Sequence, residues 1–225
     1  MTATLLRRVT AEFVGTMLLL ATVVGSGVTG QRLAEGNVAI ALLANSIATG
    51  AALVALILAF GSISGAHFNP VVTLADAWRG GIAWAESPAY IVAQLTGALA
   101  GVVAAHLMFN LPPLSVSTHV RSGSAQMFSE FIATFGLLAV IWGCARQSRS
   151  VVSVAVGGYI TAAYWFTAST SFANPAVTLA RCLTNTFAGI QPADVAAFIA
   201  AQLAGAFAAT LLFQWLAPFS TAARN

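Results

Sequence analysis

The chain has 225 residues, of which 59% are hydrophobic and only 7% are charged. A soluble domain carries roughly 25% charged residues, so this composition excludes an ordinary soluble protein. Nine arginines, no lysine and six acidic residues give a formal charge of +3, but the scattered arginines form no basic run interleaved with aromatic residues, which excludes nucleic acid as a partner.

Six apolar segments follow one another along the chain, and each is close to the roughly 20 residues that a helix needs to cross a bilayer. They run over residues 11–30, 38–60, 88–109, 126–145, 151–169 and 195–216. The first segment lacks the cleavage pattern of a signal peptide, so we expect it to be retained as a span. The sequence predicts an all-α membrane protein with six transmembrane helices in the lipid bilayer.

The arginines predict the orientation of these spans, because positive charge concentrates on the cytoplasmic side of a membrane. With the N-terminus inside, the arginines on the cytoplasmic side are Arg7, Arg8, Arg79, Arg146, Arg149 and Arg224. The arginines on the outer side are then Arg32, Arg121 and Arg181. We therefore expect both termini in the cytoplasm and the chain in the cell membrane.

Three short blocks of sequence recur in the same order in the two halves of the chain. Residues 11–16 match 129–134, residues 69–75 match 174–180, and residues 93–98 match 201–206. Each half holds three spans, so the second half must enter the membrane from the opposite side, the inverted-repeat plan of transporters and channels. We expect a single domain, 1–225, with half-repeats 1–110 and 125–220.

An Asn-Pro dipeptide lies between the second and third spans of each half. Asn69 and Asn174 can cap a helix, and Pro70 and Pro175 suit its first position, where the N–H would be unpaired anyway. A helix from Asn69 to about Trp78 is roughly 15 Å long, half the roughly 30 Å hydrocarbon thickness. A lone Asn-Pro pair usually does no more than start a helix. Two at matched places predict re-entrant half-helices that meet N-terminus to N-terminus near the midplane.

Residues 64–73 (SGAHFNPVVT) and 171–176 (SFANPA) resemble the two signature motifs of the aquaporin and aquaglyceroporin family, and the likeness covers essentially the whole chain. The resemblance implies a channel of six spans and two half-helices, a pore in every subunit of a homotetramer, and no cofactor. It places at the pore centre Asn69, Pro70, Val71, Asn174, Pro175 and Ala176. Two residues depart from the family pattern: Val71 replaces an alanine, and Val177 replaces an arginine.

The resemblance also implies a narrow outer filter. Counted from the family motif, this filter consists of Thr49, Ala162, Ser171 and Val177. Water-selective members resemble one another in using a bulky aromatic residue, histidine and arginine here, so this set predicts a wider opening. Its hydroxyl and methyl groups suit a neutral solute that presents both hydroxyls and an apolar face. Alternatively, Thr49 and Ala162 are simply small residues that let helices pack.

Backbone carbonyls complete the pore that the resemblance implies. The residues that would supply them are Gly65, Ala66, His67, Thr170, Ser171 and Phe172. Acceptors along both arms and asparagine amides at the centre would reorient a passing chain of hydroxyls and so break a proton wire. His67 fits a core histidine that holds the loop as well as a pore-lining one.

Two matched carboxylates, Glu12 and Glu130, stand at the starts of two spans. They are either first-turn acids favoured by the helix dipole or, as the family suggests, acceptors that brace the re-entrant loops. Gln94 and Gln202, also matched, are expected to bond between helices. No nucleophile or metal-binding pattern accompanies them, and the two cysteines form no cluster, so we expect neither an enzyme nor a metal site.

These features predict a passive channel for small uncharged solutes such as glycerol-like polyols and water. The chain also resembles bacterial aquaglyceroporins linked to arsenic resistance, which lack the filter arginine too, and this resemblance implies neutral hydroxides of trivalent arsenic or antimony as further solutes. The alternatives are a water-selective aquaporin and a secondary transporter, which would need titratable groups near mid-span that the sequence lacks. Arg181 lies four residues after Val177 and shares its helix face. It is either a displaced charge in the outer vestibule or a structural residue.

Overall fold

A computed structural model describes residues 3–217, and all regular structure in that part of the chain is helical. The six long helices are α1 (Leu5–Leu33), α2 (Val38–Ser64), α4 (Ser87–Met108), α5 (Ser124–Cys144), α6 (Arg149–Phe166) and α8 (Pro192–Leu216). The short elements are α3 (Pro70–Trp78), α7 (Pro175–Arg181) and the 3-10 turn η1 (Trp84–Glu86). The predicted class, an all-α membrane protein with six transmembrane helices and two half-helices, is confirmed.

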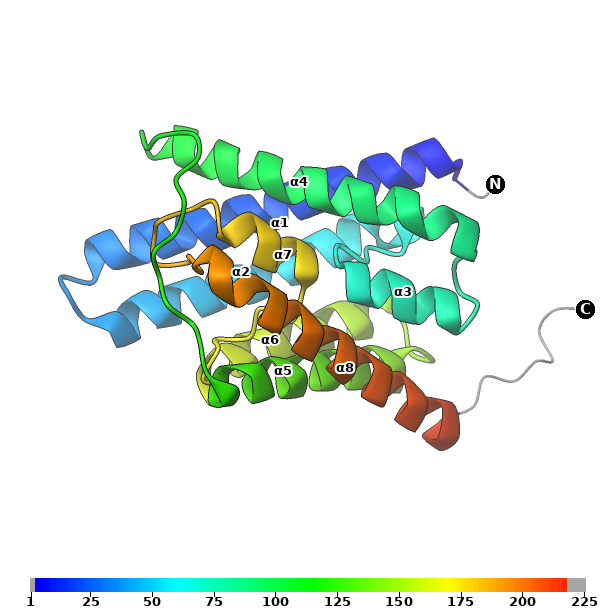
Figure 1. Ribbon diagram of the computed structural model, residues 1–225. Coiled ribbons are helices and arrows are strands. Elements are labelled where there is room, and N and C mark those ends of the chain that lie inside the picture. The colour runs from blue at the N-terminus through cyan, green and yellow to red at the C-terminus, as the bar shows by residue number, and fades with distance from the viewer. Residues whose placement is uncertain (1–2, 218–225) are drawn as a thin grey trace, which may run out of the picture.

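The long helices pack in pairs, α1 with α2 and α4, α5 with α6 and α8, and α2 with α6. In Figure 1, α3 and α7 start near the middle of the molecule and run towards opposite ends. The start of α1 and the end of α8 lie at the same end of the bundle (Figure 1). The chain thus crosses the bundle an even number of times between the start of α1 and the end of α8, as six spans require.

Local signals move several helix ends away from the predicted bounds. The Thr4 hydroxyl accepts from the Arg7 N–H, so α1 begins before residue 11. Gly65 takes a left-handed φ of +93° and ends α2 just after residue 64 instead of residue 60. The fifth span ends at Phe166, because the next residues form the extended approach to Asn174.

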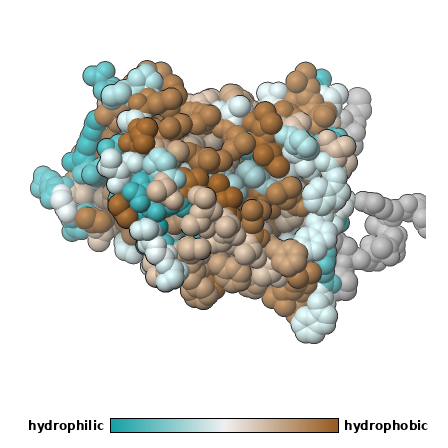
Figure 2. Space-filling view, in the orientation of Figure 1, coloured by the Kyte–Doolittle hydropathy of each residue, from teal (hydrophilic) through white to brown (hydrophobic). Residues whose placement is uncertain are grey.

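The outer surface of the bundle is apolar. Figure 2 shows hydrophobic residues over most of the middle of one face, with hydrophilic residues gathered mainly towards its left end. Five of the described helices are long and apolar enough to cross a membrane. The exception among the six long helices is α6, which has 18 residues, begins with Arg149 and includes Tyr159 and Tyr164. Lipid-facing apolar side chains and polar ends are what a membrane protein requires.

Several helix pairs approach so closely that only glycine fits at points of the contact, and two of these points occupy matched places in the two halves. A Cβ atom on Gly97 of α4 would lie 2.4 Å from the Phe13 carbonyl oxygen of α1. A Cβ atom on Gly205 of α8 would lie 2.4 Å from the Phe131 carbonyl oxygen of α5. Small residues at such points allow helix backbones to pack closely in lipid, where the hydrophobic effect drives helix association only weakly.

We predict that Gly97→Ala destabilises the protein by roughly 1–3 kcal/mol, because the new methyl group meets main chain that cannot move aside. Gly158→Ala in α6 is the matched control, since a Cβ atom there meets nothing within 4 Å. Thermal unfolding in detergent measures both variants. Equal midpoints for the two would contradict the close contact between α1 and α4.

Candidate functional site

Each half-helix is capped by the asparagine that precedes it. The Asn69 Oδ1 atom accepts from the Val71 N–H at 3.1 Å. The Asn174 Oδ1 atom accepts from the N–H groups of Ala176 and Val177 at 2.9 and 3.3 Å. The proline at the first position of each helix has no N–H to satisfy. The first turns of α3 and α7 therefore have the same N-cap, an asparagine followed by a proline.

The two asparagines also tie the half-helices to one another. The Asn69 amide donates to the Ala173 carbonyl, and the Asn174 amide donates to the Phe68 carbonyl, both at 2.8 Å. Each amide has a second N–H, which no described residue accepts. Both asparagines line the same cavity, so this second N–H is available to a solute there.

The loop before α3 is anchored on a buried carboxylate. Glu12 has no exposed surface and accepts from the backbone N–H groups of His67 and Phe68 at 2.9 and 2.7 Å. The Ser64 hydroxyl and the Gln94 amide donate to the same carboxylate at 2.6 and 2.8 Å. Four donors satisfy the buried carboxylate, which makes its burial tolerable.

The loop before α7 repeats this arrangement. Glu130 is equally buried and accepts from the backbone N–H groups of Phe172 and Ala173 at 2.8 and 2.9 Å. The Gln202 amide donates to Glu130 at 2.6 Å and to the Thr178 hydroxyl at 2.8 Å. The two carboxylates that the sequence pairs therefore hold equivalent backbone groups in the two halves.

The loop carbonyls are left without protein partners. Within residues 3–217, no hydrogen bond reaches the backbone oxygens of Gly65, Ala66, His67, Thr170, Ser171 and Phe172. Several loop residues adopt positive φ angles that side chains rarely take, among them Ala66 at +53° and Ser171 at +52°. Their N–H groups are used by the protein and their carbonyls are not, so the loops offer acceptors to a solute.

A cavity of about 520 Å³ runs between the two loops. Five of the six residues with free carbonyls line it, and Thr170, whose hydroxyl lies 3.4 Å from Arg121 Nη1, does not. Pro70, Val71, Pro175 and Ala176 are buried outside its wall. His67 lines the cavity and also holds structure, since its Nδ1 atom lies 3.1 Å from the Thr73 hydroxyl. Both roles left open for His67 are thus compatible with its position.

Three of the four expected filter residues, Thr49, Ser171 and Val177, line the cavity. Ala162 does not, and this expectation is corrected: its side chain lies on the exposed face of α6. Tyr164 lines the wall instead, with its hydroxyl 3.3 Å from the Thr49 hydroxyl. The lining residues of α6 recur every four positions, at 152, 156, 160 and 164. That helical period is the sequence signal that counting from the motif overlooks.

Comparison with known proteins identifies the family. Residues 1–153 and 147–224 match the Major intrinsic protein family. The chain is 55% identical over 212 residues to an aquaglyceroporin, AqpS, of Rhizobium meliloti (strain 1021), a match that covers 94% of this chain and 91% of that protein. The chain belongs to the major intrinsic protein family. It is a passive multi-pass membrane channel for small solutes, and not an enzyme.

Other relatives in this family share less of the sequence. The channel is 34% identical over 192 residues to aquaporin NIP1-4 of Oryza sativa subsp. japonica, covering 82% of this chain and 69% of that one. The X-ray structure of the aquaglyceroporin from Plasmodium falciparum matches with a TM-score of 0.72, covering 94% of this chain and 95% of that one at 22% identity. The likeness to that structure concerns the fold.

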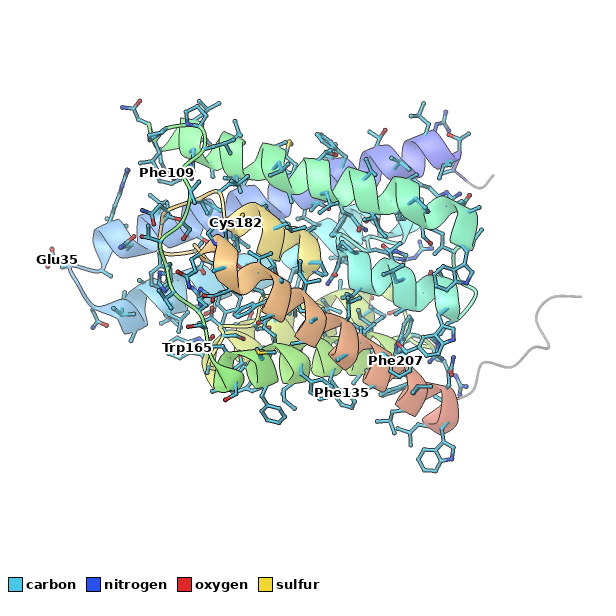
Figure 3. The ribbon with its side chains drawn as sticks, in the orientation of Figure 1. Glu35, Phe109, Phe135, Trp165, Cys182 and Phe207 are labelled. Atoms are coloured by element: carbon cyan, nitrogen blue, oxygen red, sulfur yellow. The ribbon has the colours of Figure 1, made fainter. Side chains whose placement is uncertain are left out.

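We predict that Glu130→Gln destabilises the folded channel by about 2 kcal/mol or more. The NH₂ group of glutamine would face N–H donors that formerly bonded to a carboxylate oxygen, and these donors would lose their acceptor. Glu35→Gln is the matched control, since Glu35 lies exposed at the tip of the α1–α2 turn (Figure 3). Thermal unfolding and solute flux measure both variants. Wild-type behaviour of Glu130→Gln would contradict the anchoring role.

We predict that Ala162→Leu leaves solute flux unchanged. Tyr164→Leu should widen the cavity and raise the ratio of glycerol flux to water flux about twofold. Swelling of proteoliposomes measures both fluxes. A drop in flux confined to Ala162→Leu would instead place residue 162 in the constriction.

Proposed function

We propose that uncharged solutes cross this channel in single file through the cavity between α3 and α7. The observation that carries the proposal is the division of hydrogen-bonding groups along that cavity. Carbonyls without protein partners belong to both loops, and the asparagine amides stand where the half-helices meet. A solute can exchange its hydration shell for acceptors along both arms and donors in the middle.

Charged species are disfavoured at the centre of this path. The N-terminal ends of α3 and α7 carry partial positive charge and approach one another, which repels cations. Donors at the centre and acceptors on both sides reverse the orientation of a hydroxyl chain, which interrupts proton transfer along it.

The solutes that this wall suits are glycerol-like polyols, neutral hydroxides of trivalent arsenic or antimony, and water. Thr49, Ser171 and Tyr164 supply hydroxyl groups, and Val177 supplies an apolar surface without the family's usual charge. A small molecule with several hydroxyls and a compact centre meets both kinds of surface. The 55% identity to a protein named an aquaglyceroporin supports solutes larger than water.

We also infer that both termini face the cytoplasm in the cell membrane. Arg7, Arg8 and Arg149 belong to helices at the end of the bundle where α1 begins and α8 ends, and Arg79 directly follows α3 at that end (Figure 1). Arg32 closes α1 at the opposite end. The larger number of arginines at the first end supports a cytoplasmic location for that end. Arg224, counted with it in the sequence, lies outside the described residues.

The proposed assembly is a homotetramer, with one pore in each subunit. Large apolar side chains such as Ile47, Trp165 and Phe207 are exposed, which leaves surface for lipid and for neighbouring subunits. The half-repeats 1–110 and 125–220 remain a proposal for the domain plan. The mass of the protein in detergent, corrected for bound detergent, tests the number of subunits.

Stopped-flow swelling of proteoliposomes tests the function. We expect water, glycerol and a neutral metalloid hydroxide each to cross faster than through protein-free vesicles, at rates that a proton gradient does not change. Flux driven by the gradient would indicate a secondary transporter, and flux of water alone would indicate a water-selective aquaporin.

We predict that Val177→Arg narrows the path, because arginine is larger, always charged and carries five N–H donors. Glycerol and metalloid fluxes should fall at least about tenfold, and water flux should fall least. Val177→Leu is the matched control for volume without charge. Unchanged glycerol flux in a Val177→Arg protein that still conducts water would place residue 177 outside the constriction.

A further inference from the structure

Arg181, the last residue of α7, is a buried charge on the wall of the cavity. Its side chain is 2% exposed, and it belongs to the lining of the cavity. Its Nε group donates to the Ala188 carbonyl, and its guanidinium carbon lies 3.4 Å from the centre of the Phe172 ring. Figure 3 shows the next residue, Cys182, at the end of α7 that points towards the α1–α2 turn. The guanidinium is therefore held in place by two neighbours at that end of the cavity.

The two terminal nitrogens of Arg181 have no protein partner. Within residues 3–217, neither Nη atom makes a hydrogen bond and no carboxylate pairs with the guanidinium. Arg121, whose guanidinium carbon lies 4.9 Å from the same ring, differs, because it donates to the carbonyls of Gly189 and Ser169 at 2.8 and 3.1 Å. Buried N–H groups of a cation are costly to leave unbonded, so the Nη groups of Arg181 call for an acceptor in the cavity.

Ser171 supplies a second unpartnered group on the wall of the same cavity. Its hydroxyl is buried, makes no hydrogen bond within the described chain, and belongs to a residue of the same cavity wall. Ser171 directly precedes Phe172, whose ring lies against the arginine. The two terminal nitrogens of Arg181 and the hydroxyl of Ser171 are therefore left unbonded by the described chain, and their residues both contact Phe172, one through its ring and one through the peptide bond.

The equivalent position in the other half does not offer such donors. Asp76 follows Asn69 by seven residues, as Arg181 follows Asn174. Asp76 also lines the cavity, but its carboxylate has a neighbour, with Oδ2 3.7 Å from the His67 Nε2 atom. The position of α7 that Arg181 occupies thus offers open N–H groups, and the matched position of α3 offers a carboxylate.

We propose that Arg181 and Ser171 recognise two adjacent hydroxyl oxygens of a neutral solute, so that the channel distinguishes solutes of equal size. A guanidinium presents parallel N–H groups that match two oxygens lying side by side. Hydroxyls on neighbouring carbons, or on one central atom, can accept both bonds together. Hydroxyls separated by a further carbon lie farther apart in most conformers, so they accept both bonds less readily. The site rests on the proposed passage of solutes through this cavity.

The test compares 1,2-propanediol with 1,3-propanediol, which have the same atoms and differ in the spacing of their hydroxyls. After subtraction of the flux through protein-free liposomes, the 1,2 isomer should cross the wild-type channel about fivefold faster. Arg181→Lys keeps the charge but loses the fork, so the ratio should fall to about one. Arg32→Lys is the matched control, because this exposed arginine also stacks on an aromatic ring, 5.3 Å from Phe109, away from the cavity.

Either of two results would overturn the site while leaving the channel intact: equal rates for both diols in the wild-type protein, or a ratio that survives in Arg181→Lys. Both diols would then still cross faster than through lipid alone. If neither diol crossed faster than through lipid, the proposed function would fail together with the site. The wild-type ratio alone decides the matter if Arg181→Lys does not assemble.

Discussion

Two stretches of non-helical backbone pass through the interior of this helical bundle, and the rest of the structure depends on how their polar groups are satisfied. Unpaired backbone groups at membrane depth cost several kcal/mol each. Glu12 and Glu130 take up the N–H groups of the two loops, and Gln94 and Gln202 hold these carboxylates from neighbouring helices. The burial of two carboxylates is thus the condition for having two re-entrant loops.

Of the backbone groups of the loops, the carboxylates satisfy only the N–H groups, and this leaves the loop carbonyls for the path that we propose for solutes. The carboxylates stand outside the cavity wall and accept from loop N–H groups, so the carbonyls are left for the cavity. The asparagines complete the arrangement, because each caps its own half-helix with its oxygen and ties the opposite loop with its nitrogen. One set of hydrogen bonds therefore fixes the loops and lines the path.

Much of this could be predicted from the sequence, because matched blocks in the two halves mark residues under the same constraint. The spans, the half-helices and the capping of each by its asparagine follow from apolar length and local helix signals. Ala162 could not be placed by counting residues back from the Asn-Pro motif. Residues 167–173 are not helical, so a fixed spacing from Asn174 does not show which face of α6 a residue occupies. The partners of Arg181 come from Phe172 and Ala188, which only the folded loops bring to it.

The proposed path of conduction is the cavity between the half-helices. The most direct measurement is thiol block of glycerol flux in a variant with Cys144 and Cys182 replaced by serine. A single cysteine at residue 171, inside the cavity, should allow a small methanethiosulfonate reagent to stop the flux. A cysteine at residue 168, exposed on the loop outside the cavity, should react without effect. Undiminished flux after full labelling at residue 171 would mean that solutes cross by another path.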